Sequence, residues 1–267
     1  MFDYFTQRRR QRVRAQAFPP AWRRFVERNV TVFARLPPHD QAELLGHVQV
    51  LLAEKHFEGC GGLELTDEIR VTVAAQACVL LLHRETDYYP RLTSILIYPS
   101  AYMVPGDRPV GDGIWQEGDD ARLGHTAPRL GALLLAWDAA LHGARNLDDG
   151  DNLVFHEFAH QLDFEDFAVD GTPPLESRAQ YASWSRVLGA EYDELRRASA
   201  GGTATLLDQY GATNPAEFFA VATEFFFDRP RELRQRHAAL YGELRSFYRQ
   251  DPAEWKDSGP PVSPPVV

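Results

Sequence analysis

The sequence predicts an α+β fold that is mostly helical, with a small mixed β-sheet beside one central helix. Apolar residues recur at helical spacing over most of the 267 residues. Two short runs of strand-forming residues interrupt this pattern, at residues 92–102 and 130–137. The helix expected after the second run carries the motif HEFAH at residues 156–160, and we expect the sheet to lie beside it.

The helical segments are placed by their caps and breaks. Pro37-Pro38 divides the apolar pattern between residues 19 and 57, which predicts two helices there. Thr66 is a typical N-cap, and the helix expected from it to about residue 83 is apolar on nearly all sides, as a buried helix is. Residues 104–128 are rich in glycine, proline and charge, and predict loops with short strands. Four more helices are expected, at about residues 152–164, 178–200, 215–227 and 230–249.

We expect one domain with an extension at each end. Residues 1–17 form a basic segment, and residues 257–267 form a proline-rich tail that lacks the apolar content to pack and is expected to be disordered. The domain between them, residues 18–256, divides into an N-terminal helical part at about 18–90 and a part at about 91–256 that carries the motif.

The basic segment contains Arg8, Arg9, Arg10, Arg12 and Arg14. We favour a solvated helix or a frayed terminus for it. A basic arm for an anionic partner and the start of an organellar presequence are the alternatives, because the segment has a single acidic residue. No apolar stretch of the kind that a secretory signal needs follows the arginines.

Composition argues against several classes of protein. The formal net charge is −10, which argues against direct binding to nucleic acid, because neutralising phosphates requires a surplus of Lys and Arg. Even the apolar run at residues 71–82 is shorter than the roughly 18 residues that a membrane span needs. Cys60 and Cys78 are too few for a disulfide framework and indicate reduced thiols, which predicts a cytoplasmic protein.

The motif HEFAH indicates a metal site. On a helix, His156 and His160 lie one turn apart on the same face, so both imidazoles can reach one zinc ion. Glu157 lies about 100° further round the helix, where its carboxylate can accept a proton from the attacking water. The alternative is a surface helix with incidental histidines. We disfavour it because these side chains stand among phenylalanines, where burial without partners is costly.

A catalytic zinc site needs a third protein ligand. The segment NPAEFFAVATEFFF offers Glu217 and Glu224, seven residues apart and so on one face of a helix. Either could instead pair with an arginine such as Arg229 or Arg231. Spacing alone leaves this choice open.

Four separated blocks of the sequence carry a family resemblance. In chain order they are FEGCGGLELTDEIRVTVAAQ, YYPRLTSILIYPSAY, NLVFHEFAHQLD and DQYGATNPAEFFAVATEFFF. Together they closely resemble the Mlc titration factor A family of zinc-dependent peptidases, over about residues 18–255. The resemblance implies a zincin-like fold related to the catalytic domain of anthrax lethal factor, with one zinc ion per chain. It also implies that Glu217 is the third ligand and Glu224 a supporting or structural carboxylate.

Two further residues are candidates for the site. The resemblance assigns Tyr210 to stabilising the oxyanion of the tetrahedral intermediate, a role that suits a phenol donor; the alternative is a half-buried tyrosine with a satisfied hydroxyl. Asp163 lies one turn after His160, where it either orients that imidazole or closes the end of the helix. The other histidines show no ligand-like spacing to one another, and we expect them to be structural or exposed: His39, His47, His56, His83, His125, His142 and His237.

These residues predict a zinc metallopeptidase in which Glu157 passes the proton of the attacking water to the leaving amine. The resemblance suggests short peptides and aminopeptidase-like action. The strand at residues 130–137 would offer a sheet edge to an extended peptide.

The main alternative is a partner-binding protein in which zinc is chiefly structural. The resemblance implies association with the transcriptional repressor Mlc and a link to sugar uptake. An intact motif with Glu157 favours the enzyme, because structural zinc normally has four protein ligands and needs no base. A zinc hydrolase for another substrate class is a third possibility, because the ligand set does not define the substrate.

Overall fold

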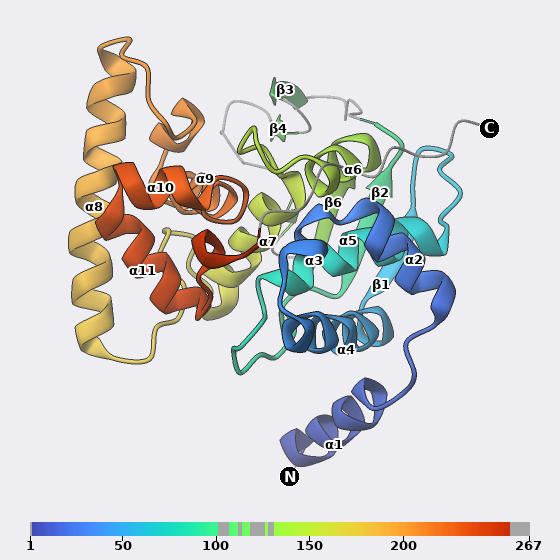
Figure 1. The fold of residues 1–267 in the computed structure, drawn as a ribbon. Helices are drawn as coiled ribbons and strands as arrows, with labels where there is room; N and C mark the ends of the chain where they lie inside the picture. The colour runs from blue at the N-terminus through green and yellow to red at the C-terminus, as the bar shows by residue number, and fades with distance from the viewer. Residues whose placement is uncertain (1, 101–106, 112–113, 118–125, 128–130, 257–267) are drawn as a thin grey trace.

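The computed structural model describes residues 2–100, 107–111, 114–117, 126–127 and 131–256 (Figure 1). The expected disordered tail at residues 257–267 and much of the stretch 104–128 lie outside the described residues. The helices are α1 (Phe2–Arg14), α2 (Pro20–Asn29), α3 (Thr31–Arg35), α4 (Pro38–Glu54), α5 (Asp67–Val79), α6 (Trp137–Arg145), α7 (Leu153–Asp163), α8 (Arg178–Ala200), α9 (Pro215–Asp228), α10 (Pro230–Arg236) and α11 (Ala238–Tyr248). The strands are β1 (His56–Gly59), β2 (Ser94–Tyr98), β3 (Asp107–Gly111), β4 (Ile114–Glu117), β5 (Thr126–Ala127) and β6 (Ala132–Ala136).

The main sheet has the strand order β1-β2-β6-β5. The first three strands run parallel, and β5 pairs antiparallel with β6, so the sheet is mixed as predicted. Side chains alternate along the strands, with Ile95, Ile97, Leu133 and Leu135 buried against the helices. The mostly helical α+β class and both predicted strands are therefore confirmed.

One prediction about the strands was wrong, and a second is contradicted for two residues only. The helical pattern was expected to run to residue 57, but residues 56–59 form β1. The backbone N–H of His56 donates to Thr93 O at 2.9 Å, and the chain continues alongside β2. Pairing with a buried strand here outweighs the helical pattern of the preceding residues. The first two residues of β6 are also not a free edge for substrate, because β5 pairs with them on the side opposite β2.

Some helix boundaries also differ from the prediction. The segment before Pro38 contains two helices, α2 and α3, rather than one. The last predicted helix is divided at His237, where the backbone leaves the helical region between α10 and α11. Helix α6 was not expected, and it follows β6 without an intervening loop.

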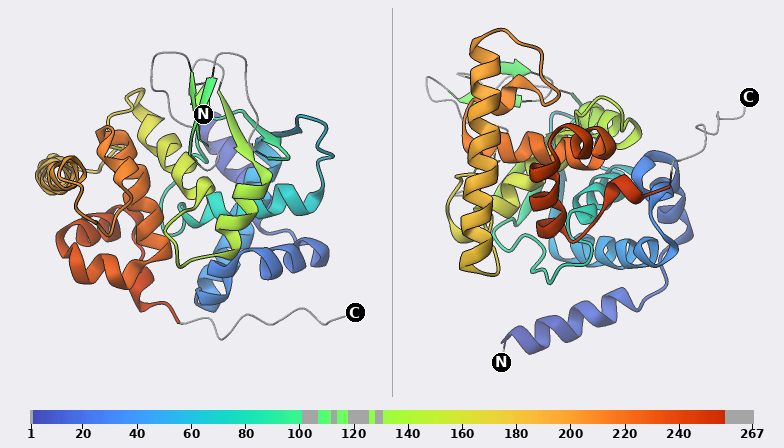
Figure 2. Two further views of the ribbon diagram at one scale, coloured as in Figure 1. Left: turned by 90° about the horizontal axis from the view of Figure 1, so that it is seen from above. Right: turned by 60° about the vertical axis from the view of Figure 1, so that its left-hand side comes forward.

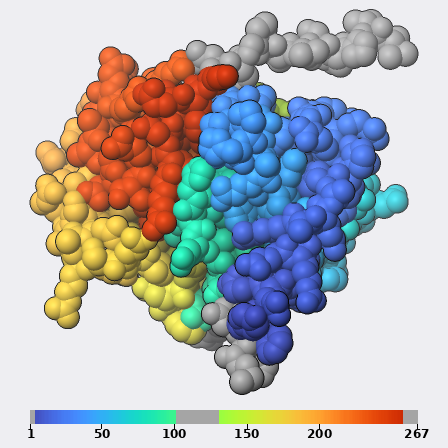
Figure 3. Space-filling view, turned by 60° about the horizontal axis from the view of Figure 1, so that its bottom comes forward, coloured from blue at the N-terminus to red at the C-terminus, as the bar shows by residue number. Residues whose placement is uncertain are grey.

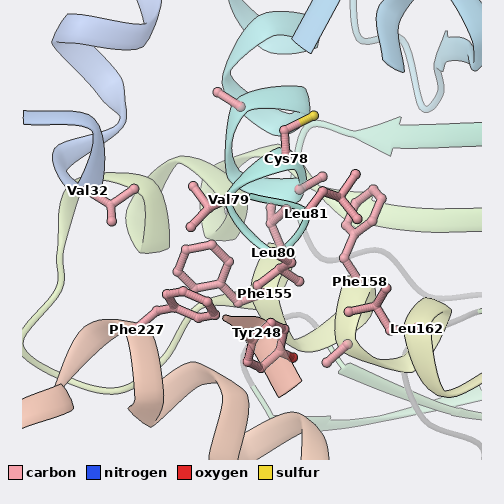
Figure 4. Packing of buried hydrophobic residues seen from close by; sticks show 14 of the residues in the cluster. Val32, Cys78, Val79, Leu80, Leu81, Phe155, Phe158, Leu162, Phe227 and Tyr248 are labelled. Atoms are coloured by element: carbon pink, nitrogen blue, oxygen red, sulfur yellow. The ribbon is translucent and has the colours of Figure 1, made fainter. Parts of the chain in front are cut away.

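Three helices form the centre of the molecule. Helix α5 is buried along nearly its whole length, and α7 and α9 are buried at almost every residue. Figure 4 shows α7 contributing Phe155, Phe158 and Leu162 to a shared core with Phe227 of α9 and Tyr248 of α11. The long helix α8 flanks the C-terminal helices on the outside (Figures 1 and 2). The motif helix is thus held between the N-terminal part with its sheet and the C-terminal helices.

The basic N-terminal segment forms α1, which lies against α4 (Figure 1). Arg10 is only 6% exposed, and its guanidinium donates to Glu54 at 3.0 Å and to Asp87 at 2.7 Å. Arg14 donates to the hydroxyl of Tyr88 at 2.8 Å. At least these two arginines therefore attach the helix to the rest of the molecule. Among the described residues, no helix is both long and apolar enough to cross a membrane.

Candidate metal centre

Helix α7 begins at a well-defined cap. The side chain of Asn152 accepts a hydrogen bond from Phe155 N at 3.0 Å, and its amide donates to Gly143 O at 3.1 Å. Every residue from Leu153 to Asp163 is buried. The polar side chains of the motif therefore lie inside the protein, where their charges require partners.

Helix α9 brings a carboxylate to the same place. Asn214 caps its first turn by accepting from Glu217 N at 3.0 Å, and Pro215 occupies the position where a missing N–H costs nothing. The side chain of Glu217 is fully buried in the first turn of α9, and α9 packs against α7.

His156, His160 and Glu217 converge on one point. The Nε2 atoms of the two histidines are 3.2 Å apart. Glu217 Oε2 lies 3.1 Å from His156 Nε2, and Glu217 Oε1 lies 3.1 Å from His160 Nε2. The two imidazole rings meet at 77°, with centroids 4.9 Å apart.

This arrangement fits a metal ion. Glu217 Oε1 is buried and has no hydrogen-bond partner among the described residues, although His160 Nε2 is near. Ligands of a tetrahedral ion with bonds of about 2.0–2.1 Å lie a little over 3 Å apart, close to the separations here. Two imidazole nitrogens and a carboxylate form a donor set that divalent transition metals prefer.

The second carboxylate of α9 has a different position. Glu224 Oε1 lies 2.7 Å from His156 Nδ1, on the side of the ring opposite Glu217, and Glu224 Oε2 accepts from Asn152 N at 2.6 Å. Glu224 therefore orients His156 and ties it to the start of α7. Arg229, considered as a partner for either glutamate, instead pairs with Glu232 at 2.6 Å.

The charges of the site shift one another's pKa values. Burial alone would lower the pKa of His156, but the carboxylates of Glu224 and Glu217 outweigh it and raise that pKa well above its usual range. Burial also opposes protonation of His160, yet Glu217 raises the pKa of this imidazole. Burial disfavours the charged form of Glu217, but the two histidines lower its pKa to about 2. Without an ion, protons on the histidines thus supply the positive charge that the carboxylate requires.

Two candidate catalytic residues border the ligands. Glu157 is fully buried on α7. Burial lowers and Glu217 raises the pKa of His160, burial raises the pKa of Tyr210, and the charge of Glu157 adds to both increases. Tyr210 lies in the short helix η2 (Gln209–Ala212), with its ring centroid 6.1 Å from that of His156. Its hydroxyl is buried without a hydrogen-bond partner among the described residues, and burial raises its pKa. The structure therefore brings both residues to the metal centre.

Asp163 contacts a loop rather than an imidazole. Its Oδ2 accepts from Gly171 N at 2.8 Å, while neither its Oδ1 nor His160 Nδ1 has a hydrogen-bond partner in the described part of the chain. Burial raises the pKa of Asp163 to about 6. Of the two roles expected for it, the contacts match the one at the end of the helix.

Gly171 itself is tightly enclosed. It has φ +77°, and a Cβ atom there would lie 2.3 Å from Pro215 O at the start of α9. Its carbonyl accepts from Trp184 Nε1 at 2.9 Å. The loop after α7 thus lies directly between the end of one ligand-bearing helix and the start of the other.

A cavity of about 600 Å³ adjoins the centre, and sequence reasoning did not find it. His156, Glu224 and Tyr210 line one side of it. Asp149, Asp151 and Asp208 add acidic side chains from two loops far apart in the sequence. The run of aspartates before the motif was the available signal, although spacing could not place it at a cavity.

Comparisons with known proteins agree with this geometry. Residues 5–249 match the family model described as glucose-regulated metallo-peptidase M90. An uncharacterized protein of Synechocystis sp. is 40% identical over 234 residues, which cover 88% of this chain and 85% of that protein. Mlc titration factor A of Yersinia pestis and that of Yersinia pseudotuberculosis are each 31% identical over 244 residues, covering 89% of both chains. The chain therefore belongs to the M90 family of glucose-regulated metallopeptidases.

Proposed function

We propose that the chain is a zinc-dependent peptidase that acts on short peptides in an aminopeptidase-like way. His156, His160 and Glu217 would hold one zinc ion per chain, and Glu157 would be the general base. The observation that carries this proposal is the convergence of three buried ligand atoms next to Glu157. One of them, a carboxylate oxygen of Glu217, has no hydrogen-bond partner within the described residues.

The side chains divide the chemistry among them. A bound zinc ion would supply a Lewis acid that polarises the peptide carbonyl and lowers the pKa of water. Glu157 would take a proton from the attacking water and deliver it to the leaving amine. The hydroxyl of Tyr210, free of other partners in the described residues, would donate a hydrogen bond to the carbonyl oxygen as negative charge develops on it.

The acidic cavity supports aminopeptidase-like action. Asp149, Asp151 and Asp208 line it next to His156 and Tyr210. Carboxylates there would attract the ammonium group of a peptide's N-terminus and hold the first peptide bond near the ligands. Peptides with a free amino group should therefore be cleaved faster than the same peptides after acetylation.

Supporting roles fall to two carboxylates. We assign Glu224 to holding the Nδ1 side of His156, so that Nε2 faces the ion. We assign Asp163 to fixing the loop at Gly171. The cysteines Cys60 and Cys78 are both free, which supports a reducing compartment such as the cytoplasm.

The test separates the base from the ligands. Hydrolysis of short peptides is measured with zinc-loaded wild type and with Glu157→Gln, and the zinc content of both is determined. We expect the variant to keep its zinc and to lose at least about a hundredfold in rate. Glu165→Gln, which alters a partly buried glutamate just after α7, is the matched control and should keep its activity. Equal rates for wild type and Glu157→Gln would overturn the assignment of the base.

The names of the Mlc titration factor A relatives support a second proposal, that this chain binds a repressor of the Mlc type. In that case zinc would serve mainly to hold the cleft together. Binding of the zinc-loaded chain to such a repressor can be measured by titration calorimetry, with Glu157→Gln as the comparison. Equal affinity of both proteins would mean that binding does not need the peptidase chemistry, and no measurable binding would remove this proposal.

A further inference from the structure

A second group of imidazoles and carboxylates lies outside the peptidase centre, and we call it the α4 cluster. It consists of His39, Asp40 and Glu43 from the first turns of α4, with His83 from the segment after α5. One ligand atom each of Asp40, Glu43 and His83 lies within 4.8 Å of the other two. Figure 3 shows the segment after α5, in teal, crossing the surface between α4 in blue and the C-terminal helices in orange.

The central atom of the α4 cluster is Asp40 Oδ1. It lies 2.8 Å from His39 Nε2 and 3.1 Å from His83 Nε2. The residue is 4% exposed, yet Oδ1 has no hydrogen-bond partner in the described part of the chain. A buried carboxylate oxygen close to two imidazole nitrogens, but bonded to neither, points to a missing cation.

The peptidase centre contains the same feature. Glu217 Oε1 also lies 3.1 Å from an imidazole nitrogen, is buried, and has no hydrogen-bond partner among the described residues. In both places, one ligand atom from each of three residues lies within 4.8 Å of the other two. Contacts of this kind are expected from side chains that share an ion.

Glu43 holds the cluster in shape. Its Oε1 accepts from the backbone N–H of His83 at 3.0 Å and lies 3.2 Å from His47 Nε2. Its Oε2 is 3.4 Å from His83 Nδ1. These contacts fix the position of His83 beside Asp40.

We propose that Asp40, Glu43 and His83, with His39 beside them, form a second site for a divalent transition-metal ion. Imidazole nitrogens together with carboxylates favour zinc, cobalt or nickel over calcium and magnesium, which prefer oxygen ligands. The side chains of His39 and His83 are 74% and 32% exposed, so an ion enters from solvent and retains water ligands. The bound ion would fasten the segment after α5 to α4.

The experiment counts ions per chain. Full-length protein stripped with a chelator is loaded with Zn²⁺, passed through a desalting column, and analysed for zinc. We expect two zinc ions per chain in wild type and one in each of His83→Asn and His160→Ala. The double variant, which combines His83→Asn with His160→Ala, should bind none. Asparagine suits position 83 because the backbone there has φ +62°, which Asn tolerates well. His56→Asn, at an exposed histidine outside the cluster, is the matched control and should keep both ions.

Two further measurements distinguish loss of the metal site from misfolding of a variant. Asp40→Asn changes the cluster without altering its volume and should also bind one ion. In His160→Ala, added Zn²⁺ should raise the Tm, because the α4 cluster is then the remaining site; in the double variant it should not. One zinc ion in wild type that disappears in His160→Ala, or two ions in both wild type and His83→Asn, would overturn the proposal. Neither outcome would count against the peptidase centre, whose chemistry is tested separately by the rate of peptide hydrolysis.

Discussion

The metal centre on α7 and α9 and the α4 cluster use the same kinds of donor atom but differ in burial. His156, His160 and Glu217 are at most 6% exposed, whereas in the α4 cluster only Asp40 is buried to that extent. His39 and His83 are partly exposed, so water can solvate their side chains. At the buried centre, the negative charges of the carboxylates must instead be balanced by protons on the histidines or by an ion. The carboxylates therefore raise the pKa values of both histidines there. The two sites therefore differ in burial rather than in the kinds of ligand. The buried one suits catalysis, and the exposed one suits holding the segment after α5 on α4.

The largest contrast should come from removing one carboxylate in each place. Glu217→Gln should weaken zinc binding at the peptidase centre by more than about a hundredfold, because even a residue behind a ligand contributes 10–100-fold. Its activity should fall to background. Asp40→Asn should leave the rate of peptide hydrolysis unchanged. Loss of activity in Asp40→Asn would break the separation between the two sites.

The next largest effect should come from Tyr210, a hydrogen-bond donor at the peptidase centre. Tyr210→Phe removes one donor beside the ligands and should lower kcat by about 10²–10³, with zinc content unchanged. Tyr181→Phe, which removes a hydroxyl that accepts from Leu175 N, provides the control. Steady-state kinetics on one short peptide would decide, and a loss confined to KM would contradict the role given to Tyr210.

Glu224 makes a smaller contribution through His156. Glu224→Gln keeps an acceptor for the Nδ1 proton but removes the negative charge, so zinc affinity should fall by about 10–100-fold. Competition with a chromophoric chelator measures this directly. An unchanged affinity would show that Glu224 serves the fold rather than the ligand.

Zinc uptake should release protons at the buried centre. Because Glu224 and Glu217 raise the pKa of His156 above its usual value, the metal-free protein carries protons at pH 7 that the ion displaces, about one to two per ion. A raised folded pKa stabilises the metal-free protein below the unfolded pKa, and this contribution is lost as pH rises through the folded value. Calorimetry of His83→Asn in buffers of different ionisation enthalpy counts the protons; zero release would contradict the raised pKa values.

The smallest effect belongs to the exposed part of the α4 cluster. Without metal, His39→Ala should change the free energy of unfolding by less than about 1 kcal/mol, because exposed ion pairs contribute little. With zinc present, urea unfolding should show a larger loss. A loss of the same size under both conditions would argue against an ion at His39.

The sequence was informative where a pattern lies within one element. HEFAH occupies a single helix, so the spacing of one turn correctly predicted that His156 and His160 lie together. The choice between Glu217 and Glu224 came from the family resemblance, because seven residues on one helical face leave both plausible. Which atom each carboxylate contacts depends on how α9 lies against α7, and spacing does not report that.

The misses share a physical cause. Strand β1 depends on pairing with β2, nearly forty residues later, and helical periodicity gave no sign of it. The contact between Asp40 and His83 likewise joins two elements, so spacing along the sequence gave no sign of it. Long-range packing determines these features, and a local pattern cannot contain it.

Gly171 limits the distance between the two helices that carry the metal ligands. With the backbone of Gly171 between the end of α7 and Pro215, the distance between the two ligand-bearing helices is limited by a residue that has no side chain. A side chain at this position would clash with Pro215 and displace the start of α9, which carries Glu217, away from the histidines. The position of Glu217 relative to the two histidines therefore depends on a loop residue that supplies no ligand.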